Sequence, residues 1–249
     1  MKWTLILSGL NTGEYNMNFD IELTSKCNPD LAYFRLYRWQ PFCISLGANQ
    51  KIEDIDSIKT DNDGIDIVKR PTGGRAILHA EELTYSAIIP LHNKLTPKEI
   101  YEKISRSLIR GLTTYNQIFS NLELENLQPN FPELLKQPTG VLCFGSTAKN
   151  EVKFNGKKII GSAQRKLDKV ILQHGSILCG TYHQKLIEYI NSDKSNKELF
   201  AKELFEKTTE IETVTGTPIN YYSLINSIIE GFKKEWQVEF ESVIKGNSF

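Results

Sequence analysis

The pattern of apolar and polar positions divides the chain into short strands and longer helices. Apolar residues at every second position from Ala32 to Leu36 give residues 32–39 the period of a β-strand, and residues 82–90 alternate in the same way. An Asn155-Gly156 pair between two apolar runs predicts a hairpin turn. By these signals we predict the remaining strands at residues 3–7, 42–46, 65–69, 151–154, 157–160, 170–178 and 238–240.

Other segments carry their apolar side chains at helical spacing. The longest is residues 97–118, where Thr96 and Glu99 form a capping box and Pro97 occupies the first turn. In residues 13–26 we expect Ile21 to point inward and Asp20 to lie on the polar side. Further helices are predicted at residues 52–59, 184–190, 196–207 and 218–236.

The order of these elements predicts an α/β or α+β fold, in which a mixed β-sheet is flanked by helices. The 249 residues contain no repeat, no low-complexity segment and no linker rich enough to mark a second domain. We therefore expect one catalytic-type domain over residues 1–249, with residues 181–249 as its mainly helical C-terminal part.

Charge and composition exclude several classes of protein. Lys plus Arg and Asp plus Glu both total 30, so a broad basic surface for nucleic acid is not expected. No apolar run approaches the roughly 20 residues of a membrane span, and the first residues fit a strand better than a signal peptide. The four cysteines form no Cys-x-x-Cys pair, which disfavours zinc. We expect a cytoplasmic monomer with free thiols and no metal.

One stretch concentrates residues that can carry chemistry. Cys143 precedes the predicted hairpin, and Lys158 follows its turn. The small residues at 161–163 leave room for a ligand or a second backbone, and His174-Gly175 interrupts an otherwise apolar strand. Each feature has a structural alternative, because a lone cysteine is most often a small buried hydrophobe and a hairpin lysine an ordinary surface charge. The pattern alone leaves both readings open.

A second candidate is the loop at residues 70–75. Pro71 fixes one backbone angle, and Gly73-Gly74 permits a tight turn that directs backbone N–H groups toward a bound phosphate, carboxylate or carbonyl. The spacing is not that of a P-loop, and a Gly-Gly turn between strands is most often only a turn. The polar residues 120–140, which lead to Cys143, are predicted to form a long loop.

Taken together, these segments resemble the lipoate–protein ligase and octanoyltransferase superfamily. The resemblance is carried by residues 70–79 with 82–86, by 155–164 and by 171–178, and Asn16, Met17 and Asp20 match the family's opening helix. It implies the catalytic-domain fold of biotin protein ligases. It also implies an enzyme of lipoate biosynthesis that moves an octanoyl or lipoyl group onto one lysine of a carrier domain.

The branches of this superfamily differ in chemistry. Ligases activate the free acid with ATP, and their glycine loop usually has a third glycine where this chain has Arg75. Octanoyltransferases that carry Cys-Phe just before the hairpin use that thiol as nucleophile, and Cys143-Phe144 stands at this place. The resemblance therefore favours a cysteine acyltransferase, with Cys143 forming the acyl-enzyme and Lys158 supplying positive charge beside the thioester carbonyl.

The same resemblance gives the remaining site residues and the partners. The donor would be octanoyl-acyl carrier protein, and the acceptors lipoyl-domain proteins such as the glycine cleavage H protein and 2-oxoacid dehydrogenase subunits. No cofactor is expected, because the phosphopantetheine arm belongs to the donor. The substrate-binding candidates are Arg70, Thr72, Gly73, Gly74, Arg75, His79, Gly161, Ser162, Ala163, His174 and Gly175.

Three alternatives stay open at this point. An ATP-dependent lipoate ligase would use the glycine loop for an acyl-adenylate and leave Cys143 incidental. A lipoyl or octanoyl amidotransferase would move the chain between carrier proteins. A non-catalytic protein of this fold would only bind lipoyl domains. For an acidic carrier, a local docking rim is expected from Arg35, Arg38, Lys69, Arg70 or Lys149.

Overall fold

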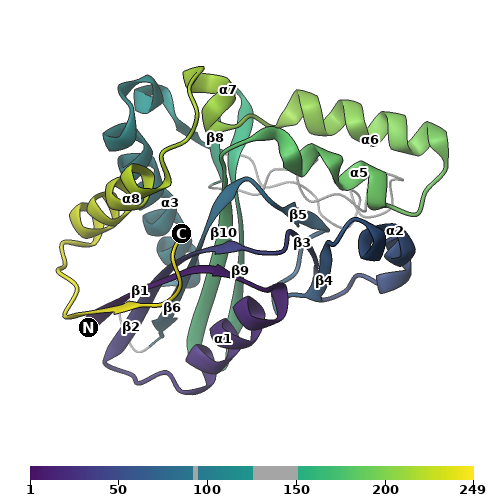
Figure 1. Ribbon diagram of the computed structural model, residues 1–249. Helices are drawn as coiled ribbons and strands as arrows, with labels where there is room; N and C mark the ends of the chain where they lie inside the picture. The colour runs from purple at the N-terminus through teal and green to yellow at the C-terminus, as the bar shows by residue number, and fades with distance from the viewer. Residues whose placement is uncertain (92–94, 126–150) are drawn as a thin grey trace.

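The computed structural model describes residues 1–91, 95–125 and 151–249, which form two β-sheets flanked by helices (Figure 1). The larger sheet has the strand order β11-β1-β2-β6-β10-β9-β8-β7, and the smaller one has the order β4-β3-β5. The strands of the large sheet are β1 (Lys2–Asn11), β2 (Leu31–Trp39), β6 (Glu82–Pro90), β7 (Glu123–Leu124), β8 (Val152–Phe154), β9 (Lys157–Leu167), β10 (Val170–Leu178) and β11 (Ser242–Lys245). Those of the small sheet are β3 (Cys43–Leu46), β4 (Asp66–Lys69) and β5 (Ile77–His79).

The large sheet is mixed, as the order of elements predicts. Strand β1 runs parallel to both of its neighbours, β2 and β11. From β2 through β6, β10, β9 and β8 to β7, every pairing is antiparallel. The prediction of a mixed sheet flanked by helices is confirmed.

Two helices cover one face of the large sheet, α3 (Pro97–Tyr115) and α8 (Tyr221–Trp236) (Figure 1). Their apolar stripes pack on the sheet, where the rings of Phe34 and Phe232 stack with centroids 4.1 Å apart. The two helices come close because a glycine of each lies at the crossing. A Cβ on Gly231 would stand 2.3 Å from the backbone nitrogen of Gly111.

The other face of the large sheet is covered by α1 (Gly13–Ser25), and here two expectations are wrong. Ile21 is exposed, whereas Asp20 is fully buried. The reason lies in β2, whose Arg35 points under α1 and pairs with Asp20 at 2.9 Å. The buried face of α1 is therefore partly polar, and helical spacing alone does not show which face of the helix is buried.

The remaining helices belong to the part of the molecule around the small sheet and to the C-terminal region (Figure 1). They are α2 (Ser57–Asn62), α5 (Leu186–Tyr189), α6 (Lys194–Lys207) and α7 (Ile211–Thr215), with 3-10 turns at Ile52–Asp54 and Thr181–Lys185. A further 3-10 turn at Gln117–Asn121 directly follows α3. The small sheet, α5 and α6 share a second apolar cluster, which includes Ile44, Leu186 and Phe200.

Most local predictions are confirmed. The hairpin turn has positive φ at both Asn155 and Gly156. The capping box between Thr96 and Glu99 is present at the start of α3. The closing strand is wrong in position, since residues 238–240 are not a strand and β11 begins at Ser242. Residues 161–163, expected to follow a strand, lie inside the longer β9.

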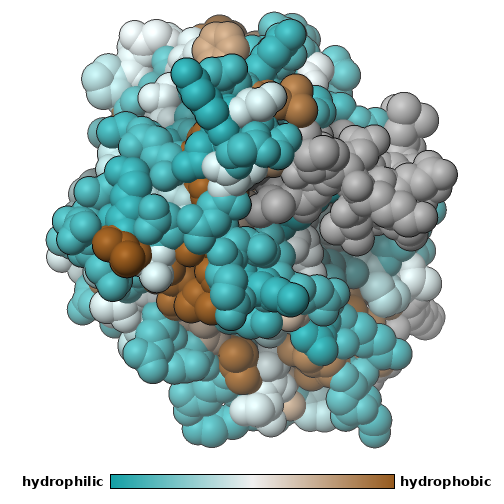
Figure 2. Space-filling view, turned by 90° about the vertical axis from the view of Figure 1, so that its right-hand side faces the viewer, coloured by the Kyte–Doolittle hydropathy of each residue, from teal (hydrophilic) through white to brown (hydrophobic). Residues whose placement is uncertain are grey.

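The view in Figure 2 shows a mostly hydrophilic face, on which hydrophobic residues gather in small separate groups. Among the helices of residues 1–91, 95–125 and 151–249, none is long and apolar enough to cross a membrane.

Candidate active site

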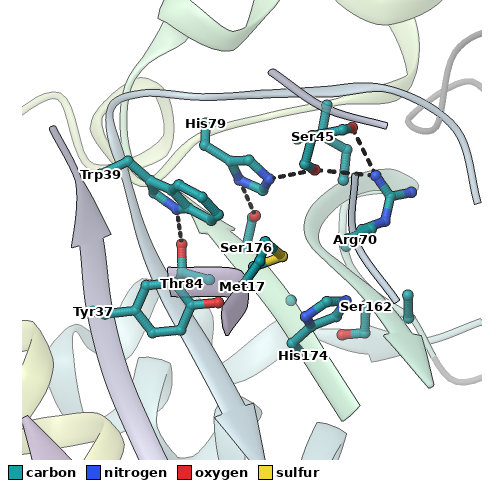
Figure 3. Close-up of a pocket in the computed structure, with 14 residues that line it drawn as sticks. Met17, Tyr37, Trp39, Ser45, Arg70, His79, Thr84, Ser162, His174 and Ser176 are labelled. Carbon is teal, nitrogen blue, oxygen red and sulfur yellow. Dashed lines mark hydrogen bonds between the residues drawn. The ribbon is translucent and has the colours of Figure 1, made fainter. Parts of the chain in front are cut away.

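A pocket lies where α1, the large sheet and the small sheet meet (Figure 3). Its volume is about 400 Å³ when the space at its open mouth is included. The wall is built from six strands, one helix and one loop, and consists of Met17, Tyr37, Trp39, Ser45, Arg70, Ile77, His79, Thr84, Gly161, Ser162, Ala163, His174, Gly175 and Ser176.

The polar side chains of this wall form hydrogen bonds with one another and with buried neighbours, rather than pointing their polar atoms into the pocket. His79 Nδ1 lies 2.8 Å from Glu82 Oε1, and His79 Nε2 lies 2.7 Å from Ser45 Oγ. Trp39 donates its indole N–H to Thr84 and stacks on the His79 ring at 4.1 Å between centroids. Because the hydrogen-bonding atoms face each other, the pocket presents ring faces and methyl groups to a ligand.

Glu82 is the buried charge that organises this network. Its Oε1 accepts hydrogen bonds from Thr84 and Ser176 in addition to the contact with His79. Burial acts to raise the pKa of Glu82, but the charge of His79 and the three hydrogen bonds outweigh it, and the pKa is lowered. Glu82 is therefore a carboxylate at neutral pH, although it is 1% exposed.

Arg70 holds the glycine loop in place from the pocket side. Its guanidinium donates to the carbonyl oxygens of Gly73 and Arg75, at 3.1 and 2.6 Å. It also donates to the carbonyl and hydroxyl oxygens of Ser45 on β3. The planar fork of arginine suits such a role, since it ties two backbone segments together with fixed geometry.

His174 joins the glycine loop to β10 from the other side. Its Nε2 lies 2.6 Å from the hydroxyl of Thr72, and its Nδ1 lies 4.0 Å from Asp20 Oδ2. Burial, together with the positive charges of Arg70 and His79, lowers the pKa of His174 to about 3. The imidazole is therefore neutral at physiological pH and acts as a hydrogen-bonding group.

Lys158 lies on β9, three residues before Gly161, and does not line the pocket. Its ammonium is 2.9 Å from Glu151 Oε2, and the two side chains are 1% and 4% exposed. The backbone of Lys158 pairs with Lys153 of β8 on one side and with Thr208 in an isolated parallel bridge. The interpretation of Lys158 as an ordinary surface lysine is thus wrong.

The structure gathers most of the predicted binding residues but not all of them. Arg70, His79, Ser162 and His174 line the pocket together with Gly161, Ala163 and Gly175. Thr72 is buried behind His174. The two glycines of the loop are exposed, and Arg75 is buried outside the pocket wall. Cys143 lies outside the described residues.

The predicted basic rim is wrong for two of its members. Arg35 is fully buried against Asp20, and Arg70 is 4% exposed within the glycine loop. The guanidinium of Arg38 stacks over the ring of Tyr221 at 3.6 Å, which leaves Lys69 as an exposed member. Lys149 lies outside the described residues.

Several wall residues were not predicted from the sequence, among them Tyr37, Trp39, Ser45 and Thr84. They lie on strands whose apolar pattern gives no sign of a site. The available signal is a polar residue inside a run that is otherwise apolar, as with Ser45 between Ile44 and Leu46. Such a residue requires a partner when both faces of the strand are buried.

The thiols that the structure describes are poor nucleophiles. Burial raises the pKa of Cys43 and of Cys179 well above the ordinary range, and it raises the pKa of the half-buried Cys27 to about 11. In the same described residues, no group of three or more His, Cys, Asp or Glu side chains is placed to hold a metal ion.

Comparison with known proteins decides the family. Residues 12–233 match the model of the lipoyl protein ligase A/B catalytic domain. The chain belongs to the lipoyl protein ligase A/B family. An octanoyltransferase LipM of Clostridioides difficile is 37% identical over 96% of this chain and 89% of its own length. Another, from Staphylococcus aureus, is 34% identical over 96% of this chain and 88% of its own.

Solved structures agree in fold with this family assignment. A bipartite lipoate protein ligase from Thermoplasma acidophilum superposes with a TM-score of 0.75 at 19% identity, over 98% of this chain and 88% of that one. A lipoate-protein ligase A bound with ATP gives the same TM-score at 18% identity, over 98% and 90% of the two chains. At these identities the likeness concerns the fold. The expected lipoate ligase-like fold is confirmed.

Proposed function

We propose that this chain is an octanoyltransferase of lipoate biosynthesis. It takes an octanoyl group from the thioester of an acyl carrier protein, holds it on Cys143 and passes it to the acceptor lysine of a lipoyl-domain protein. The observation that carries the proposal is the identity of 37% to an octanoyltransferase, spread over 96% of the chain. The acceptor class is supported by the structural neighbour from Thermoplasma acidophilum, a lipoate protein ligase described together with its E2 lipoyl domain as parts of one lipoylation system.

The pocket supports an acyl chain as its occupant. Its polar wall residues satisfy one another, so an alkyl chain meets few unpaired donors or acceptors. Burying such a chain contributes about 0.8 kcal/mol per CH₂ group, which gives the enzyme a means of selecting chain length. Gly175 lets β10 and β9 pair closely beside the pocket, since a Cβ there would stand 2.4 Å from the backbone oxygen of Gly161 and 2.8 Å from the hydroxyl of Ser162.

The reaction proceeds in two transfers. The thiolate of Cys143 attacks the thioester carbonyl of the donor, and the phosphopantetheine thiolate leaves. The neutral amine of the acceptor lysine then attacks the acyl-enzyme, Cys143 leaves as thiolate, and the amine proton is released. The first exchange conserves a thioester and the second forms an amide, so neither needs ATP or a resident cofactor. Lys158 stabilises the oxyanion that develops in both steps.

The test is the intact mass of the protein after incubation with octanoyl-acyl carrier protein in the absence of ATP. Wild type is expected to gain one octanoyl group, and peptide mapping to place it on Cys143. The variant Cys143→Ser is expected to gain none. Cys27→Ser is the matched control, because Cys27 is the most accessible of the described thiols, and it is expected to behave as wild type.

Three outcomes would contradict the proposal. Transfer to a lipoyl domain that requires ATP and octanoic acid, and survives Cys143→Ser, would establish a ligase. An acyl-enzyme that forms only from an octanoylated glycine cleavage H protein would establish an amidotransferase between carriers. A protein that binds the lipoyl domain and transfers nothing from any donor would be a binding module.

A further inference from the structure

The pair formed by Lys158 and Glu151 differs from the other lysine–carboxylate pairs of the described residues in its burial. Its side chains are 1% and 4% exposed, whereas the next most buried such pair, Lys153 with Glu125, is 19% and 12% exposed. Removing both charges from water costs several kcal/mol per ion, which their attraction repays only in good geometry. A pair held at this cost beside a substrate pocket calls for a functional explanation.

The backbone around Lys158 is fixed from two sides. Strand β10 makes its last pairing with β9 between Ile177 and Ile160, so it does not reach Lys158. Beyond this point the backbone of residues 208–209 pairs with β9 instead. Thr208 forms a parallel bridge with Lys158, and the N–H of Thr209 donates to the Lys158 carbonyl at 3.0 Å. The hydroxyl of Thr208 lies 3.2 Å from Nε2 of the buried His183.

The charge of Glu151 also affects Tyr85, which contacts the pocket wall. Together with burial, which has the larger effect, this charge raises the pKa of Tyr85 to about 12. The hydroxyl of Tyr85 in turn lies 2.7 Å from that of Ser162, a wall residue on the same face of β9 as Lys158. The charge of Glu151 thus acts both on Lys158 and on a residue that contacts the wall.

We propose that Glu151 is a positioning residue for the acyl transfer: its carboxylate keeps the Lys158 ammonium charged and directed at a fixed point beyond the pocket wall. A buried lysine without a counter-ion loses its proton more easily, because burial disfavours the charged form. Held 2.9 Å from the Glu151 carboxylate, the Lys158 ammonium has a fixed position from which it is able to stabilise a developing oxyanion. This inference rests on the proposed octanoyl transfer for its kinetic consequence but not for the protonation state itself.

Other titratable groups on the elements packed around β9 have to be considered in a pH experiment. Strand β8 contributes Lys153, which is paired with Glu125, and β6 contributes Tyr85. The C-terminal region contributes His183 and Glu210, whose Nε2 and Oε1 are 3.4 Å apart. Glu151 Oε2 lies 2.9 Å from the Lys158 ammonium, so removing this carboxylate perturbs the lysine directly.

The first measurement is the pKa of Lys158, read from the lysine ¹³Cε shift during a pH titration and assigned with Lys158→Arg. In Glu151→Gln the pKa is expected to fall by at least about one unit, the size of effect that an adjacent opposite charge exerts. Glu151→Asp retains the charge and is expected to recover most of the shift. Glu125→Gln, which removes the carboxylate of the more exposed Lys153 pair, is the matched control and is expected to leave it unchanged.

The second measurement is the pH profile of octanoyl transfer for the same variants. Loss of activity at high pH is expected to begin at lower pH in Glu151→Gln, by the same interval as the pKa. An equal Lys158 pKa in Glu151→Gln and wild type would overturn the inference, as would a loss of activity that is uniform in pH. The Lys158 pKa could differ between wild type and Glu151→Gln as expected while wild type transfers no octanoyl group. That result would refute the proposed function and leave the effect of Glu151 on Lys158 standing. If Glu151→Gln does not fold, Glu151→Asp is compared with wild type: its shorter side chain holds the carboxylate farther from Lys158, so the Lys158 pKa is expected to fall slightly, and an unchanged pKa would overturn the inference.

Discussion

Two buried ion pairs of the described residues, Arg35–Asp20 and Lys158–Glu151, differ in their surroundings. The Arg35–Asp20 pair ties α1 to the large sheet, and the Lys158–Glu151 pair lies at the far end of β9. Arg35 donates also to Ser8 and Asn16, and its guanidinium stands over the rings of Phe19 and Tyr37. Lys158 is a compact ammonium on a flexible stem, the kind of cation whose protonation responds to its surroundings.

The first pair has a structural role, which is to hold α1 on the large sheet. In the arginine cluster the charge is always present, and a dense set of hydrogen bonds converts it into a fixed helix position. Burial raises the pKa of Asp20, although Arg35 and the hydroxyls of Ser86 and Tyr37 oppose the rise. The pair is thus no large source of stability in itself, but breaking it leaves a buried charge without its counter-ion.

The largest expected effect follows from breaking the arginine cluster. Asp20→Asn keeps the shape of the side chain but leaves the Arg35 guanidinium buried without its carboxylate. We expect the free energy of unfolding to fall by about 3–5 kcal/mol, measured by urea denaturation. A loss below about 1 kcal/mol would mean that the neighbouring hydrogen bonds hold α1 without the charge pair.

The second prediction concerns the Lys158–Glu151 pair. In the double variant Lys158→Met, Glu151→Leu, both charges are replaced by apolar side chains of similar size. Such replacements of buried pairs are often neutral or stabilising, so we expect the urea midpoint to stay or rise. Octanoyl transfer is expected to fall by at least about 100-fold, as when a group that stabilises an oxyanion is removed. Retained activity would show that this pair is structural, like the first.

The neutral His174 gives a prediction about pH. Burial lowers the pKa of His174 from its ordinary 6.5 to about 3 in the folded protein, so between these pH values the unfolded chain binds a proton that the folded chain does not. The stability contributed by the neutral imidazole is therefore present above pH 6.5 and is lost as the pH falls toward 3, at about 1.4 kcal/mol per pH unit. In His174→Gln we expect unfolding free energy to depend less steeply on pH in this window. An unchanged slope would show that His174 is protonated in the folded protein.

The smallest effect is expected from an exposed pair, which serves as the baseline for the two buried ones. Lys194 and Glu198 are 3.9 Å apart on α6, with side chains 92% and 71% exposed. Because water and salt screen such a pair, we expect Lys194→Ala to leave the thermal midpoint and the octanoyl transfer of wild type unchanged. A clear drop in the midpoint would mean that α6 depends on its surface charges.

Much of the fold was predictable because its signals are local. The Asn155-Gly156 turn needs positive φ at both residues, and the capping box of α3 needs only Thr96 and Glu99 at the right spacing. The position of β11 was not predictable in this way. It pairs with β1, at the opposite end of the chain, and no local pattern distinguishes residues 242–245 from the 238–240 that were predicted.

The period of the strands, the caps, the turns and the family motifs can all be read along the chain, because they depend on neighbours a few residues apart. The tertiary structure alone decided which charges are buried. Arg35 and Asp20 look like surface residues in an alternating strand and an amphipathic helix, and they meet only because α1 folds over β2. Lys158 and Glu151 likewise become a buried pair only when β8, β9 and the segment at Thr208 come together, since burial depends on everything that surrounds a side chain.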